Sequence, residues 1–344
     1  MASLPATGGA AGGDSDQVLV EAHGSTRTLI LNRPNQLNVL SSAMIKGLLR
    51  CFIVFEKDDR VKLLIMKGKG RAFCAGGDVT ECVRSIHNES WKWGADFFRD
   101  LYLLNYMSAT YIKPQVFAMP ETALGSLPGE YVALAGARLD GAEMLACGLA
   151  THFVQSNRLP LLQESLKKLD TSNTFAVCST IDHFAQQPSL KENSSLNRLE
   201  IINKCFSKST VEEIISTLEQ VASNLADEWV ARTIQYLKKA SPTSLKITLR
   251  SIREGRTQTV GECLHREYRV ICHLIRGDFS RDFYEGCRAI LLDKDRRPKW
   301  MPPNLEQVHE EVVEEYFSRI DDPQWEDLNL PDRRSHGRII ESKI

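Results

Sequence analysis

The sequence predicts an α/β protein whose second half is mostly helical. Residues 17–23 and 26–32 alternate apolar and polar side chains around Gly24-Ser25, as the two strands of a hairpin do. From residue 159 onward, apolar residues recur mostly at helical spacing. Strand patterns at the start and helical patterns later therefore indicate a sheet-containing core followed by a helical region.

The elements after the hairpin follow from the spacing of apolar residues. Residues 41–57 predict a helix and residues 63–67 a buried strand. Residues 90–111 predict a long amphipathic helix. Its aromatic side chains suit packing better than stacking on nucleic-acid bases, because no basic field accompanies them: Trp91, Trp93, Phe97, Phe98, Tyr102 and Tyr106.

The second half contains a recognisable helix start. The run 209–212, Ser-Thr-Val-Glu, reads as a capping box for a helix that continues to about residue 221. Further helices are expected at 226–240, 242–253 and 258–275, and residues 186–195 are polar enough to form a loop. These patterns predict a disordered tail at 1–16, an α/β core at 17–158, a helical region at 159–320 and a C-terminal tail at 321–344.

Composition excludes several classes of partner. The 344 residues include 43 basic and 44 acidic ones, so no general field attracts nucleic acid or an anionic membrane. No apolar run approaches the roughly 20 residues that cross a bilayer. The nine cysteines form no C-x-x-C pair, which favours reduced thiols over disulfides or a structural zinc, and no other metal-ligand spacing is present. We expect a soluble protein without a metal.

A small-residue turn is the strongest chemical signal. Residues 71–78, Arg-Ala-Phe-Cys-Ala-Gly-Gly-Asp, follow the predicted strand and the bend Gly68-Lys69-Gly70. Backbone N–H groups at Ala75 or Gly76 could meet an oxyanion here, which is half of an oxyanion hole. The alternative is a tight turn with glycines for steric reasons. A dinucleotide fingerprint is excluded, because Phe73 stands where its third glycine belongs.

Several ordered motifs share one resemblance. They are residues 31–40 (Leu-Asn-Arg-Pro-Asn-Gln-Leu-Asn-Val-Leu), 117–125 (Phe-Ala-Met-Pro-Glu-Thr-Ala-Leu-Gly), 141–154, and 282–286 through 293–295, Pro298 and Trp300. With the turn at 71–78, they resemble the crotonase (enoyl-CoA hydratase/isomerase) superfamily, and within it the plant-type 3-hydroxyisobutyryl-CoA hydrolases. The resemblance covers nearly the whole chain.

The resemblance implies a crotonase-like spiral of ββα units with a mostly helical C-terminal region. It implies hydrolysis of an acyl-CoA thioester without a separate cofactor, since coenzyme A is part of the substrate. Glu121 matches the catalytic glutamate, either as a nucleophile or as a base that positions water. Without the resemblance, Glu121 would read as an ordinary surface residue. The remaining implied site residues are Ala75 and Gly76 for the oxyanion, and Gln36, Leu37, Val39, Cys74, Gly77 and Asp78 for the substrate. For Cys74, a structural role as a small buried thiol is the favoured interpretation.

Two departures from the family pattern stand out. Val116 runs directly into Phe117, where the family carries a strand, a glycine-rich turn and a helix. Ser126 follows Gly125 at once, where the family continues through Phe-Pro-Asp-Val-Gly. The second oxyanion donor and a second acidic residue are therefore missing, as in an alternative transcript or an exon-skipped gene model. Two alternatives to hydrolysis remain: a catalytically impaired paralogue that binds acyl-CoA or partner subunits, and, less favoured, an enoyl-CoA hydratase or isomerase.

The two ends of the chain carry signals for location. Residues 1–16 contain no arginine, which argues against a mitochondrial transit peptide. Ser342, Lys343 and Ile344 resemble the peroxisomal signal Ser-Lys-Leu and predict binding to the peroxisomal import receptor. The peroxisome is thus the expected location, with the mitochondrion or cytosol as alternatives. Crotonase relatives are commonly oligomers, which makes a homo-oligomer the expectation.

Overall fold

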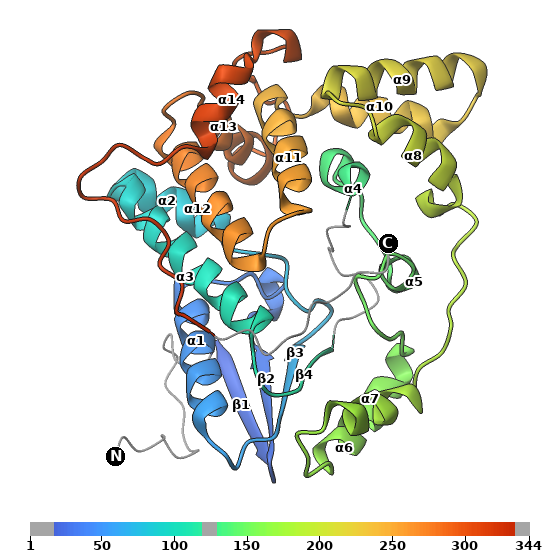
Figure 1. Ribbon diagram of the computed structural model, residues 1–344, viewed down its shortest axis with the longest axis vertical. Helices are drawn as coiled ribbons and strands as arrows, with labels where there is room; N and C mark the ends of the chain where they lie inside the picture. Colours follow the sequence, from blue (N-terminus) through green and yellow to red (C-terminus); the bar gives the residue numbers. More distant parts are fainter. Residues whose placement is uncertain (1–16, 119–128, 334–344) are drawn as a thin grey trace.

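The sheet confirms the expected hairpin and buried strand. The computed structural model describes residues 17–118 and 129–333. In those ranges four strands, β1 (Val18–His23), β2 (Thr26–Leu31), β3 (Leu63–Gly68) and β4 (Gln115–Ala118), form one sheet in that order (Figure 1). β1 and β2 are antiparallel, whereas β3 and β4 each run parallel to the preceding strand of the sheet.

Helices cover the sheet and build the rest of the described chain. Those predicted at 41–57, 90–111, 226–240, 242–253 and 258–275 are present with ends within about two residues of expectation. The α-helices are α1 (Ser42–Lys57), α2 (Val79–Asn88), α3 (Trp91–Ala109), α4 (Glu130–Ala135), α5 (Gly141–Ala146), α6 (Leu159–Lys167), α7 (Thr174–Asp182), α8 (Leu199–Phe206), α9 (Val211–Asn224), α10 (Glu228–Lys239), α11 (Pro242–Gly255), α12 (Val260–Arg276), α13 (Asp282–Cys287) and α14 (Glu310–Phe317). Most residues from 159 to 320 are helical, as the sequence predicts.

Strand β3 carries a core on each of its faces. Leu64 and Met66 point into a cluster with α1, α3 and α12, whereas Leu63 and Ile65 pack against α6 and α7. Side chains alternate along a strand, so four consecutive apolar residues serve two layers. Figure 1 shows α1 and the α6–α7 pair on opposite sides of the sheet.

The cap of α9 is displaced by one residue from the prediction. Thr210, not Ser209, accepts the Glu213 amide, and the Glu213 carboxylate accepts the Thr210 amide at 3.2 Å. Both Ser209-x-x-Glu212 and Thr210-x-x-Glu213 fit the capping pattern. The prediction at 209–212 is wrong because the local pattern alone does not distinguish the two frames.

Packing crosses both predicted internal boundaries. Tyr268 of α12 lies in the same core as the sheet, and Trp325 stacks on it with ring centroids 5.9 Å apart. Leu328 is also buried. The proposed tail 321–344 is therefore part of the core through residue 333, while the predicted tail at 1–16 lies outside the described residues.

Candidate active site

The turn after β3 folds back on the strand end. A side chain at Gly68 would place its Cβ 2.3 Å from the Ala72 carbonyl oxygen and 2.6 Å from that of Phe73. No other residue fits so close to backbone atoms. The bend predicted at Gly68-Lys69-Gly70 therefore has a steric cause, and it carries residues 71–78 to the C-terminal end of β3.

Buried Asn38 ties this turn to the segment after β2. Its side-chain amide donates to the carbonyls of Ala72 and Lys69, at 2.7 and 3.0 Å, and its side-chain oxygen accepts the Arg33 backbone N–H at 2.8 Å. Asn38 has φ 55°, a left-handed conformation that asparagine tolerates better than most residues. Residues 33–38 and 69–72 are thus held together by one side chain.

A single parallel bridge completes the connection. The Leu40 amide donates to the Gly76 carbonyl at 2.8 Å, and the Asp78 amide donates to the Leu40 carbonyl at 2.9 Å. In a parallel bridge the residue between these two bonds turns its own amide to the opposite side. That residue is Gly77, whose N–H has no acceptor within the described chain.

The amides of the turn differ from the pair expected from sequence. Ala75 donates its N–H to the Leu37 carbonyl at 3.1 Å, so this predicted oxyanion donor is occupied. Gly76 is exposed, and its amide meets only the Cys74 sulfur at 3.4 Å, a weak acceptor. The amides open to a ligand are therefore those of Gly76 and Gly77. Which amide is occupied depends on a backbone partner more than 30 residues away, and no spacing in the sequence reveals that.

Asp78 has structural partners. Its carboxylate accepts Arg33 Nη1 at 2.9 Å and caps α2 by accepting the Glu81 amide at 3.1 Å. Arg33 Nη1 also donates to the Val39 carbonyl at 2.8 Å. Arg33 was not among the predicted site residues. It lies in the 31–40 motif, but its acidic partner is remote in sequence.

The other predicted substrate-binding residues lie on the two joined segments. Gln36 is exposed at the end of a 3-10 helix, and Leu37 and Val39 are half-buried on the same loop. Cys74 is half-buried on the facing turn, where burial raises the pKa of its thiol. The thiol is therefore neutral near pH 7, which agrees with a structural role.

Glu121 lies outside the described residues. The chain is described up to Ala118, the last residue of β4, and Phe117 makes an edge-on ring contact with Phe73 of the turn at 6.1 Å. Because β3 and β4 are parallel, their C-terminal ends share one edge of the sheet. The turn at 71–78 and the end of β4 thus meet there.

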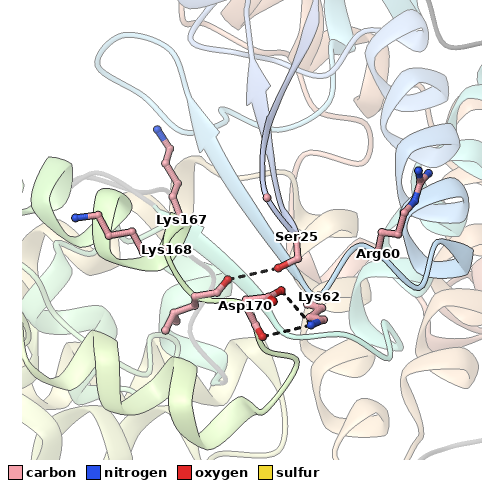
Figure 2. A pocket seen from close by; sticks show the side chains of 8 residues that line it. Ser25, Arg60, Lys62, Lys167, Lys168 and Asp170 are labelled. Atoms are coloured by element: carbon pink, nitrogen blue, oxygen red, sulfur yellow. Dashed lines mark hydrogen bonds and ion pairs between the residues drawn. The ribbon is translucent and has the colours of Figure 1, made fainter.

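Among the described residues, surface cavities lie near both ends of the strands. One, of about 510 Å³, borders Arg33 and the start of α1, and is also lined by Gln17, Ser41, Ser42, Ala43, Lys46, Glu81 and Trp93. The other, of about 440 Å³, lies at the opposite end of the strands, beside the β1–β2 turn. Figure 2 shows it with Ser25, Arg60, Lys62, Lys167, Lys168 and Asp170.

The cations of this second cavity are largely neutralised. Lys62 pairs with Asp170 at 3.0 Å, and Lys167 pairs with Glu164 at 2.9 Å. Among the described residues, no group of three or more His, Cys, Asp or Glu could hold a metal, and no helix is long and apolar enough to span a membrane. The open Gly76 and Gly77 amides make the turn at 71–78 the candidate site.

Comparison with known proteins defines the class. A model of the enoyl-CoA hydratase/isomerase family matches residues 26–126 and 115–317, and the chain belongs to this family. A solved carnitinyl-CoA dehydratase from Mycobacterium thermoresistibile is 27% identical, with a TM-score of 0.77 over 92% of this chain and 100% of that one. The mixed α/β crotonase-like fold is thus confirmed.

Full-length relatives narrow the resemblance to one branch. The probable 3-hydroxyisobutyryl-CoA hydrolase 3 of Arabidopsis thaliana is 50% identical over 95% of this chain and 99% of its own. The 3-hydroxyisobutyryl-CoA hydrolase 1 of the same plant is 51% identical over 93% and 95%. The predicted membership of the hydrolase branch is confirmed.

The same comparisons bear on the segments missing from the chain. The alignment to hydrolase 3 runs over 373 positions, more than the 344 residues present, so the relative contains residues that this chain lacks. The two family matches also overlap at residues 115–126. A match that divides here agrees with the omission recognised between Val116 and Phe117.

The peroxisomal prediction is wrong. The relatives named with a location are mitochondrial: the 3-hydroxyisobutyryl-CoA hydrolase of Homo sapiens, 35% identical over 89% of this chain, and the hydrolase-like protein 1 of Arabidopsis thaliana, 41% identical over 92%. The tripeptide Ser342, Lys343 and Ile344 lies outside the described residues. A match of three terminal residues to a targeting signal is weaker evidence for location than similarity to the mitochondrial relatives along most of the chain.

Proposed function

We propose that this protein hydrolyses the thioester of 3-hydroxyisobutyryl-CoA to 3-hydroxyisobutyrate and free coenzyme A, a step of valine degradation. The observation that carries the proposal is the 50% identity to a probable 3-hydroxyisobutyryl-CoA hydrolase over nearly the full length of both chains. The relatives favour hydrolysis over the hydratase and the impaired-paralogue alternatives.

The turn at 71–78 binds and polarises the thioester carbonyl. The thioester carbonyl oxygen accepts from the Gly77 amide, with the exposed Gly76 amide beside it. Gly76 has φ 95°, and the place of its absent side chain is open for at least 4 Å, so a ligand can approach the backbone closely. As charge develops on the oxygen, a fixed N–H dipole stabilises it without reorganising.

Glu121 supplies the nucleophile or the base. Its carboxylate either attacks the carbonyl carbon, giving an anhydride that water opens, or takes a proton from water as that water attacks. In both routes the C–S bond breaks, the sulfur leaves with the electron pair and is protonated, and water provides the oxygen of the new acid. Leu37, Val39 and Cys74 line the path by which the substrate reaches the turn. Coenzyme A enters as part of the substrate and leaves as the free thiol.

Thiol release from the purified protein tests the proposal. With 3-hydroxyisobutyryl-CoA, we expect free thiol to accumulate above the level from the protein's own cysteines. With crotonyl-CoA, we expect no loss of the enoyl absorbance, which hydration would consume. Loss of that absorbance without thiol release would make the protein a hydratase, and activity in neither assay would refute both enzymatic proposals. Light scattering on the same sample tests the expected homo-oligomer.

A further inference from the structure

We infer that Arg33 is a positioning residue, which holds the Gly77 amide in place for the thioester carbonyl. This inference rests on the proposed function and deepens it. One nitrogen of Arg33, Nη1, donates to the Val39 carbonyl at 2.8 Å and to the Asp78 carboxylate at 2.9 Å. Those two acceptors lie on the two backbone segments that the parallel bridge joins.

Gly77 stands between the fixed points. Leu40 receives the Asp78 amide and gives its own amide to Gly76, so the residues on both sides of Gly77 are bonded to Leu40. Val39 precedes Leu40 and Asp78 follows Gly77, and Arg33 bridges these two outer residues. The bridge is only one residue long, and on the Gly77 side of it Arg33 adds a side-chain link between the two segments.

Partial burial strengthens the ion pair between Arg33 and Asp78. The two side chains are 19% and 14% exposed, so water competes less with this pair than with an ion pair on the surface. Asp78 also caps α2 through the Glu81 amide, and Asn38 accepts the backbone N–H of Arg33. The Arg33–Asp78 pair thus connects the turn at 71–78 to the start of α2 through Asp78, and to residues 33–38 through Arg33.

Losing Arg33 has two consequences at the oxygen that becomes charged. The turn is free to shift, and a misplacement of about 1 Å costs on the order of 10²-fold in rate. The Asp78 carboxylate also loses its counter-charge, one residue from the amide that must stabilise a developing negative charge. Both effects act on the transition state more than on the bound substrate, so kcat is affected more than KM.

The test compares Arg33→Met, Arg33→Lys and Asp78→Asn with Arg60→Met. The last variant removes a surface arginine that pairs with Asp58 at the same distance of 2.9 Å, at the other end of the sheet. Two quantities are measured: kcat and KM for thiol release, and the infrared carbonyl stretch of bound butyryl-CoA carrying a ¹³C-labelled thioester carbonyl. That stretch moves to lower frequency when an N–H polarises the carbonyl.

We expect Arg33→Met to lower kcat by about 10- to 100-fold, with KM changed by less than about threefold, and to return the carbonyl frequency toward that of the free thioester. Arg33→Lys, which keeps a charged donor, should recover most of the frequency shift. Asp78→Asn should lie between the two, and Arg60→Met should match the wild type in both quantities.

Wild-type kcat and carbonyl frequency in Arg33→Met would overturn the inference. If Arg33→Met does not fold, Arg33→Lys and Asp78→Asn decide, and an unchanged carbonyl frequency in both would overturn it equally. The infrared measurement needs only binding, so a wild-type protein that shifts the carbonyl without releasing thiol refutes hydrolysis alone. A wild-type protein that produces no shift overturns the positioning role itself.

Discussion

Single residues decide which backbone groups of the turn can bind a ligand. The sequence identified the stretch 71–78 and the glycines within it, because small residues after a strand indicate a close backbone approach. It did not identify the roles of Asn38 and Arg33, whose partners lie about 30 to 45 residues away. For the same reason the donor expected at Ala75 is engaged, and the open amides are those of Gly76, as expected, and Gly77.

Asn38 offers a direct test at this scale. Asn38→Ala removes three hydrogen bonds from a fully buried site and leaves an alanine in the left-handed conformation. We expect a loss of about 2–4 kcal/mol in the free energy of unfolding, because buried backbone groups lose their partners. Urea unfolding measures it, with Asn35→Ala, at an exposed position of the same turn, as the control. A loss below about 0.5 kcal/mol would contradict this account of the turn.

Secondary-structure elements follow from local patterns, and this is where the sequence predicted most. Alternation around Gly24-Ser25 gave the hairpin, and helical spacing gave α1, α3 and the helices from α10 to α12. The exact N-cap residue of α9 was harder to predict, because two overlapping Ser/Thr-x-x-Glu patterns lie at the start of this helix. Tertiary packing helps to distinguish them. With Thr210 as the cap, Val211 is the first helical residue and is buried with Ile214 and Leu218 in the cluster of α8, α9 and α10.

The frame of α9 can be checked with two alanine substitutions. Thr210→Ala should lower the free energy of unfolding by about 1 kcal/mol, because the Glu213 amide loses its acceptor. Ser209→Ala should change it by less than about 0.3 kcal/mol, because the side chain is exposed and outside the cap. Thermal or urea unfolding compares the two. If Ser209→Ala lowered the free energy of unfolding more than Thr210→Ala, Ser209 would be the N-cap, as expected from sequence.

At the scale of the whole molecule, distant segments share one core. Trp325 and Leu328 pack with Tyr268 and with the side chains of α1 and α3. Arg269 pairs with Asp327, and Arg333 pairs with Glu56 of α1. Sequence patterns describe each segment by itself, and they carried no signal that residues 318–333 return to the sheet side of the molecule. The boundary expected at 321 was therefore placed within a packed segment.

Because of its buried thiols, we expect the protein to lose folding stability at high pH. Burial raises the pKa of Cys82 and of Cys272 from 9.0 to about 12. A raised folded pKa favours the neutral thiol in the folded state, so the stabilisation is complete below pH 9 and is lost as the pH rises toward 12. We expect the urea midpoint to fall as the pH rises from about 9 toward 12, and to fall less in Cys82→Ala/Cys272→Ala. An equal fall in that variant would assign the effect to other groups.

The central claim is that this chain is a thioester hydrolase, with the proposed chemistry at the edge of the sheet where the turn at 71–78 meets the end of β4. The most direct measurement is thiol release from 3-hydroxyisobutyryl-CoA by the wild type, Glu121→Gln and Glu89→Gln. Glu89 is an exposed glutamate at the end of α2 and serves as the matched control. We predict turnover by the wild type and by Glu89→Gln, and a fall of at least about 10²-fold in Glu121→Gln, the scale of lost acid–base participation. Equal turnover in all three proteins, or none in the wild type, would contradict the claim.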